Sequence, residues 1–194
     1  MIEQQIADAG KWKEAHIKYG ANNFHLLLHM IARPSRNRYN AKRSVEVHGF
    51  YMNVMELLGE GGEVPPAWYG LYAWTAVVRA AGLFGDGQKD KGYETLDIAL
   101  SYCEKIAALK KGDVLDTGKS ELLGGVKYEY GNEIILLPDG SKEPISYEWR
   151  MNFDAQNFVS CLAAPYGWEW FNSVRGEERF KEYIEKAKKI ADKQ

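Results

Sequence analysis

The segment from Val64 to Phe84 constrains the fold more than any other part of the chain, because Arg79 is its only charged residue. Two prolines stand at its start, and proline is favoured in the first turn of a helix. A long apolar segment of this kind predicts a helix over Ala67–Leu83 that is buried on nearly every side. A helix buried in this way must be central, so other helices must pack around it.

The segment Lys91–Leu109 is the expected neighbour of this central helix. Its apolar residues recur at helical spacing and fall on one face, which comprises Tyr93, Leu96, Ala99, Leu100, Cys103, Ile106 and Ala107. Glycine precedes an aromatic residue here and again near Trp12, as in the turns of tetratricopeptide repeats. The loop Gly85–Lys91 is too long for the strict repeat. Two architectures therefore remain open, tetratricopeptide-like helical hairpins and an irregular helical bundle.

Further helices are predicted on both sides of this pair. The expected segments are Ile2–Tyr19 and Asn23–Ala32 as a hairpin divided at Gly20, then Ser44–Leu58, Asp154–Ala163, and a last helix from Glu177 to about Asp192. Asp154 or Asn152 is a suitable N-cap. In the last helix Glu177 and Lys181 begin a series of i, i+4 pairs in the favourable order.

A small β meander is predicted at about 122–148. Val126–Tyr130 alternates apolar and polar residues, Ile134–Leu137 is a short apolar run, and Pro138-Asp139-Gly140 is a turn signal before Ile145–Tyr147. The predicted fold is mostly α, with a three-stranded antiparallel meander that must lie against the helices. We expect one domain over 1–194, with helical hairpins in 1–110, the insertion in 111–150 and C-terminal capping helices in 151–194.

Composition and charge limit the classes of partner. The 194 residues are 45% hydrophobic, and 25 basic against 27 acidic residues give a formal charge of -2. No global positive field draws the chain to nucleic acid or to an anionic membrane, so neither is an expected partner. The N-terminus lacks the features of a signal peptide, which favours a cytoplasmic protein. Cys103 and Cys161 both lie in apolar helical patterns and are expected to be reduced core thiols.

His25 and His29 form the sharpest chemical signal in the sequence. They stand one helical turn apart, where both imidazoles can reach one metal ion. A third ligand is unassigned, since Glu46 is near in sequence only. The pair supports an alternative function, a small metal-dependent hydrolase. The competing interpretation, which we favour, is two semi-buried histidines with ordinary hydrogen bonds, and no cofactor is expected.

A basic loop is a second candidate site. It contains Arg33, Arg36, Arg38, Lys42 and Arg43, with Tyr39 among them. Such a loop can hold phosphates, but a solvated connection whose charges pair with nearby acids fits the overall charge better. The run from Gly112 to Ser120 resembles a phosphate-binding loop. It has five residues between its glycines where the motif needs four, and a helix is expected before it, so we reject that interpretation.

Aromatic residues suggest a binding groove beside the Ala67–Leu83 helix. The candidate residues are Trp68, Tyr72, Arg79, Trp168 and Trp170. Arg79 must find an anion, either a protein carboxylate or a ligand, and the carboxylate is the commoner solution. Paired helices with aromatic side chains between them suit an extended peptide or an apolar small molecule. Core packing is the alternative role for most of these rings.

Part of the chain resembles a known family. Three stretches between about 91 and 189, GYETLDIAL, ILLPDG and GWEWFNSVRGEERFKEYIEKAKK, resemble the tetratricopeptide-like C-terminal region that follows the helix-turn-helix domain in XRE-type transcriptional regulators of Gram-positive bacteria. The resemblance implies a non-enzymatic interaction or effector-sensing module that binds a protein, a peptide or a small effector. No segment before residue 91 is typical of a helix-turn-helix, so we expect a regulatory part without its DNA-binding domain. Homodimerisation is a further expectation, because helical repeats need covered ends.

Overall fold

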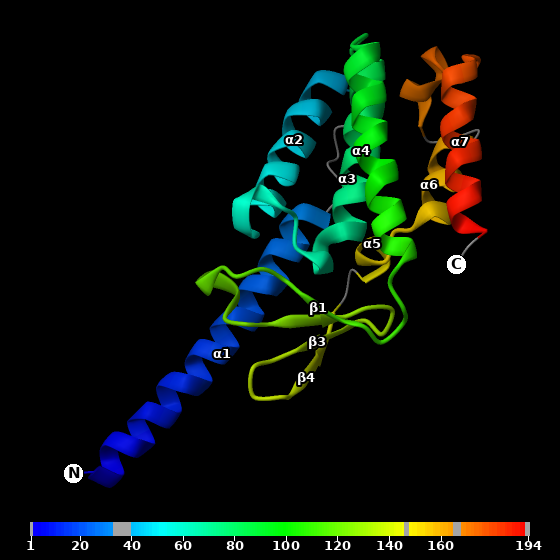
Figure 1. The fold of residues 1–194 in the computed structure, drawn as a ribbon. Helices are drawn as coiled ribbons and strands as arrows, with labels where there is room; N and C mark the ends of the chain where they lie inside the picture. Colours follow the sequence, from blue (N-terminus) through cyan, green and yellow to red (C-terminus); the bar gives the residue numbers. More distant parts are fainter. Residues whose placement is uncertain (1, 33–39, 146–147, 165–167, 193–194) are drawn as a thin grey trace.

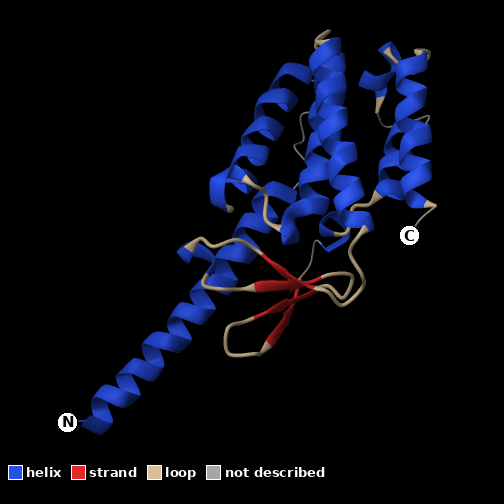
Figure 2. Cartoon of the chain, viewed as in Figure 1, coloured by secondary structure: helices blue, strands red, loops and turns tan. Residues whose placement is uncertain are grey.

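The computed structural model describes residues 2–32, 40–145, 148–164 and 168–192. Its helices are α1 (Ile2–Ala32), α2 (Ala41–Leu57), α3 (Tyr69–Gly85), α4 (Lys89–Ala107), α5 (Glu148–Met151), α6 (Ala155–Ala163) and α7 (Glu178–Ala191), shown in Figure 1. Its strands are β1 (Val114–Asp116), β2 (Lys127–Glu129), β3 (Ile134–Leu136) and β4 (Lys142–Pro144). The short 3₁₀ helices are η1 (Glu60–Gly62), η2 (Pro66–Trp68), η3 (Glu121–Leu123) and η4 (Glu169–Ser173). The fold is mostly α, as predicted (Figure 2).

Helix α3 is the centre of the fold. All its residues are buried except Tyr69, Arg79 and Gly85. Helices α2 and α4 both pack along it, and α5, α6 and η4 also contact it. The prediction of a central helix with the Lys91–Leu109 helix beside it is confirmed. Within the described ranges, every helix is too short or too polar to cross a lipid bilayer.

Helix α1 corrects the predicted hairpin at the N-terminus. The chain continues as one helix through Gly20, where two helices were expected. Gly20 is buried where α1 passes η3, and a Cβ atom there would lie 2.7 Å from the carbonyl oxygen of Leu123. This glycine therefore allows a close contact between elements and does not end the helix. The N-terminal half of α1 extends away from the rest of the molecule (Figure 1).

The β insertion has four strands, one more than predicted. They are antiparallel in the order β1-β2-β3-β4, with Leu115 opposite Tyr128 and Tyr128 opposite Ile135. These three side chains are buried and form the inner side of the sheet. Strand β1, Val114–Asp116, was not predicted from the sequence. The last strand ends at Pro144, just before Ile145, and residues 146–147 of the predicted strand lie outside the described residues.

Two long-range hydrogen bonds attach the sheet region to the helices. Trp68 Nε1 donates to the carbonyl oxygen of Thr117 at 2.7 Å, just after β1. Tyr128 in β2 donates its hydroxyl to Asn152 Oδ1 at 2.6 Å, just after α5. The sheet therefore lies against the helical body, as expected for so small a group of strands.

The C-terminal helices α6 and α7 pack against each other and against α4. Asp154 caps α6, and its side chain and that of Asn157 form a reciprocal capping box, which confirms the predicted cap. Glu177 was predicted to pair with Lys181 one turn later, but its partners lie on α4. Its carboxylate accepts from Lys89 Nζ at 2.6 Å and from the Tyr93 hydroxyl at 2.7 Å, and so joins the start of α7 to α4. Burial and the Glu177 carboxylate hold the pKa of Tyr93 well above its usual range.

Candidate functional site

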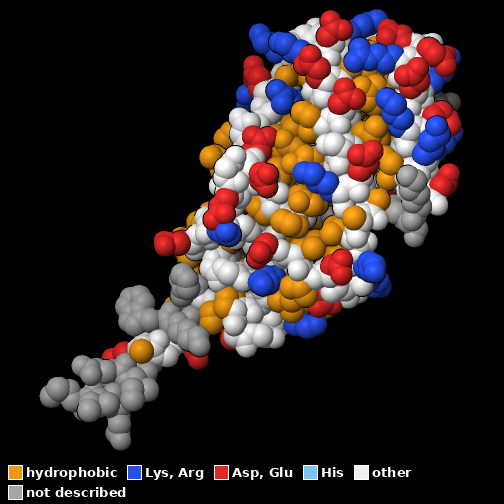
Figure 3. Space-filling model, viewed as in Figure 1, with side chains coloured by type: hydrophobic (Ala, Val, Ile, Leu, Met, Phe, Trp, Pro, Cys, Tyr) orange, Lys and Arg blue, Asp and Glu red, His pale blue; other side chains and the backbone are white. Residues whose placement is uncertain are grey.

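The surface formed jointly by α2, α3 and α4 is the strongest candidate site. Figure 3 shows hydrophobic side chains gathered between α2 and α4, with few charged groups among them. We call this surface the three-helix face. Its members are Gly49 and Glu56 of α2, Tyr69 and Arg79 of α3, and Ile98, Tyr102 and Lys105 of α4, with the buried side chains of Met52 and Tyr72 directly beneath them. Met, Tyr and Arg are the residue types enriched in the cores of protein interfaces.

Tyr72 joins the three helices at one end of this face. Its hydroxyl donates to Glu56 Oε1 at 2.5 Å, and its ring centroid lies 4.5 Å from that of Tyr102. Burial, together with the Glu56 carboxylate, raises the pKa of Tyr72 well above its usual range. The phenol therefore stays protonated and acts as a donor at any ordinary pH.

Tyr69 and Lys105 complete this end of the face. The Tyr69 ring lies 5.3 Å from the Tyr102 ring, and Lys105 Nζ lies 4.3 Å from the Tyr102 centroid and 5.3 Å from the Tyr69 centroid. Burial and the nearby Glu63 carboxylate raise the pKa of Tyr69. Burial is also the main reason that the pKa of Tyr102 rises to about 12. The cluster therefore combines three aromatic rings with the carboxylates of Glu56 and Glu63.

Arg79 occupies the other end of the face. Its Nη1 lies 3.9 Å from Met52 Sδ, and its Nε is buried without a hydrogen-bond partner. Gly49 lies beside the guanidinium, and a Cβ atom there would be in ordinary contact with Arg79 Nε at 3.4 Å. Among the residues that the structure describes, no carboxylate forms an ion pair with Arg79. The commoner solution predicted for this arginine, a protein carboxylate, is therefore not found.

The other residues of the predicted groove lie elsewhere. Trp68 is fully buried, with its ring 5.2 Å from that of Phe24. Trp170 packs at the C-terminal end of α3, where a Cβ atom on Gly85 would lie 2.6 Å from its ring. Trp168 lies 6.0 Å from Phe171. Trp68 is part of the core, and Trp168 and Trp170 pack against it. Tyr72 is also buried, but it lies on the same side of α3 as Arg79.

Sequence reasoning missed the residues that α2 and α4 contribute to the three-helix face. Ile98, Tyr102 and Lys105 recur at helical spacing beside the main apolar stripe of α4, and that second stripe is the signal for them. Glu56 carries no signal of its own, because it becomes significant only through its bond to Tyr72.

The two candidate metal ligands differ in their surroundings. His25 Nε2 lies 3.3 Å from Glu143 Oε2, which links α1 to β4. His29 is exposed, and Glu46 pairs with Arg43 at 3.3 Å. The described part of the chain holds no group of three or more His, Cys, Asp or Glu placed to share a metal ion. Among the described residues, the geometry therefore gives the histidine pair no third ligand.

Of the predicted basic loop, only its last part is described. Arg33, Arg36 and Arg38 lie outside the described residues. Arg43 begins α2, where its backbone N–H donates to Asn40 Oδ1 at 2.9 Å and its guanidinium pairs with Glu46. Arg43 is therefore an exposed surface charge that pairs with a nearby carboxylate, as in the solvated connection considered as an alternative to a phosphate site.

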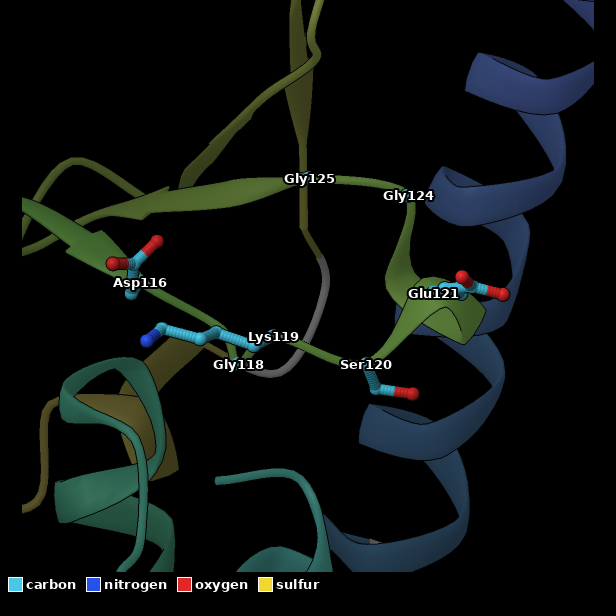
Figure 4. A pocket seen from close by; sticks show the side chains of 7 residues that line it. All are labelled: Asp116, Gly118, Lys119, Ser120, Glu121, Gly124 and Gly125. Carbon is cyan, nitrogen blue, oxygen red and sulfur yellow. The ribbon is translucent and has the colours of Figure 1, made fainter. Parts of the chain in front are cut away.

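A cavity of about 760 Å³ lies at the loop between β1 and β2 (Figure 4). It is lined by Asp116, Gly118, Lys119, Ser120, Glu121, Gly124 and Gly125. Helix α4 precedes the run Gly112–Ser120, as expected, strand β1 lies within the run, and only the three-residue η3 follows it. The side chains of Lys119, Ser120 and Glu121 point in different directions, and Lys119 already pairs with Glu60 at 2.7 Å. Because two carboxylates line the cavity, it does not favour a phosphate.

Gly118, the second residue of this loop, has a structural role. Gly118 has φ +127°, and a Cβ atom there would lie 2.3 Å from the carbonyl oxygen of Leu58. Only glycine allows the loop to pass so close to the end of α2. Gly118, which gave this run its likeness to a phosphate-binding loop, is thus explained by the close contact with Leu58.

Comparisons of the chain with protein-family models, with curated proteins and with solved structures found no match.

Proposed function

We propose that this chain is a non-enzymatic binding module whose three-helix face takes a segment of a partner protein, with a carboxylate of that segment on Arg79. The observation that carries the proposal is the guanidinium of Arg79, which is partly buried on an apolar surface and has no acidic partner among the described residues. A charged group in such a place is unfavourable unless an anion joins it. A ligand carboxylate fits this position.

The surroundings of Arg79 strengthen a carboxylate bond to it. A guanidinium and a carboxylate form paired hydrogen bonds that are about twice as strong as neutral ones. The apolar side chains around Arg79 lower the local dielectric and strengthen the attraction further. At the other end of the face, the partly buried rings of Tyr69 and Tyr102 offer rigid aromatic area, which is typical of the residues that dominate binding energy.

We further propose that this module is the sensing part of a transcriptional regulator. The support is the resemblance of 91–189 to the C-terminal region of XRE-type regulators. The coding sequence upstream of Met1 tests this role. A continuous frame that encodes a helix-turn-helix domain would support it, and a stop codon in that frame would contradict it.

If this proposal is right, peptides that bind the three-helix face should lose affinity when Arg79 is replaced. A random display library of twelve-residue peptides is selected on the full chain, and the binders are measured by calorimetry against Arg79→Met, which keeps the length of the side chain. Loss of a charged hydrogen bond of about 1.5–3 kcal/mol weakens binding roughly ten- to a hundredfold. Selected peptides should also be enriched in Asp and Glu.

Arg43→Met is the matched control, because it removes the same charge from an exposed position on α2. It should leave peptide affinity within about twofold. The urea unfolding midpoint of each variant confirms that the fold is kept. Peptides that bind Arg79→Met and the unaltered chain equally well would overturn the assignment of the face.

A further inference from the structure

Lys105 already places a cation on the rings of the three-helix face. Its ammonium stands over Tyr102 and Tyr69, and in the described part of the chain it forms no ion pair with a carboxylate. The face of an aromatic ring carries negative potential and attracts such a group. Because Lys105 is exposed at the end of a flexible side chain, it can leave the rings at little cost.

The rings under Lys105 also have acidic neighbours, whose negative charge favours a cation at this site. The Glu56 carboxylate accepts the Tyr72 hydroxyl, and the Glu63 carboxylate acts on both Tyr69 and Tyr102. Two carboxylates and one ammonium therefore act on the same group of rings. This end of the face therefore keeps a negative charge, opposite in sign to the Arg79 end.

We propose that the tyrosine cluster is a cation site, in which a lysine or arginine side chain of the bound segment displaces Lys105 from Tyr69 and Tyr102. This inference rests on the proposed function, because it describes a second anchor of the same ligand. The face then recognises one acidic and one basic residue together, and the opposite charges of its two ends set the direction of the ligand.

The spacing of the two anchors follows from helix geometry. Tyr69, the α3 ring of the cation site, and Arg79 are ten positions apart, which corresponds to about 15 Å along the helix axis. An extended peptide advances about 3.3 Å per residue. The acidic and basic residues of the ligand should therefore stand about four or five positions apart in its sequence.

Tetramethylammonium chloride tests the cation site directly, with sodium chloride at equal concentration as the control for ionic strength. Its binding to the full chain is followed through the NMR ring signals of Tyr69 and Tyr102. We expect a saturable shift that Tyr102→Leu abolishes. Lys105→Ala removes the internal competitor and should tighten binding about two- to fivefold, as expected from the strength of an exposed cation–π contact.

Lys91→Ala is the matched control for Lys105→Ala, since it removes the same charge from the other end of α4. It should leave the affinity for tetramethylammonium unchanged. If Lys105→Ala binds no more tightly than Lys91→Ala, the cation site is wrong. This outcome does not depend on Tyr102→Leu, and alanine at an exposed helical position keeps the fold.

The selected peptides separate this inference from the proposed function. Replacing their basic residue with norleucine should weaken binding to the unaltered chain about threefold or more, and should have little effect on binding to Tyr102→Leu. Peptides that depend on Arg79 but tolerate norleucine without loss would overturn the cation site alone. Peptides that are indifferent to Arg79 would overturn the proposed function, whatever the ammonium titration shows.

Discussion

At the scale of the residue, His48 shows how burial sets protonation in this chain. Its ring is almost fully buried, and Nδ1 lies 2.8 Å from the carbonyl oxygen of Ser44. A carbonyl only accepts, so Nδ1 carries the proton of the neutral ring. Burial is the main reason that the pKa of His48 falls from 6.5 to about 4, and the positive charge of Arg150 adds to the shift.

The lowered pKa of His48 predicts a loss of stability in acid. Between pH 6.5 and pH 4 the unfolded chain binds a proton at this histidine that the folded chain does not, so the free energy of unfolding falls as the pH is lowered. The loss from this group should reach about 2.5 kcal/mol at pH 4.5. His48→Gln does not titrate, so urea unfolding at pH 7 and pH 4.5 should show a smaller decrease for it. Equal decreases in both proteins would contradict the prediction.

At the scale of the element, two glycines in α1 predict different responses to the same substitution. A Cβ atom on Gly10 meets nothing within 4 Å, whereas one on Gly20 meets the carbonyl oxygen of Leu123. Gly10→Ala should raise the helicity of the N-terminal half of α1, since alanine is favoured over glycine in a helix by about 1 kcal/mol, and should change the free energy of unfolding of the whole chain by less than about 0.5 kcal/mol. Gly20→Ala should lower it by about 1–3 kcal/mol, because backbone must move. Urea unfolding with circular dichroism measures both, and a stabilising Gly20→Ala would show that α1 does not press on η3.

The elements that sequence reasoning predicted well are those whose signals are local. Helix α3 was predicted because its apolar segment contains a single charged residue. The cap of α6 was predicted because Asp154 directly precedes that helix in the sequence. Gly20 was misread as a break because its reason is a contact with a residue far along the chain. The candidate site divides in the same way. Tyr72 and Arg79 stand out as polar groups in an apolar helix, but Glu56 and Lys105 join them only when three helices pack together.

At the scale of the whole molecule, α1 is anchored by one half only. Phe24, Leu28 and Ile31 are buried in the core, whereas every described side chain before Ile17 is exposed. The N-terminal half extends beyond the body (Figure 1). A helix adds residues cheaply once it is nucleated, so the buried half is enough to propagate the projecting half.

This arrangement predicts that the projecting half of α1 contributes little to stability. A chain that begins at Ala15 should unfold within about 0.5 kcal/mol of the full chain, because the side chains described in the lost part are exposed. A chain that begins at His25 also loses Ile17 and Phe24, and should be less stable by about 3 kcal/mol or more. Hydrogen exchange of the full chain should show weak protection before Ile17 and strong protection after Phe24. If the chain beginning at Ala15 were as unstable as the shorter one, the projecting half would have to be buried in solution against another surface. Sedimentation of the two chain lengths would then show whether that surface belongs to a second copy.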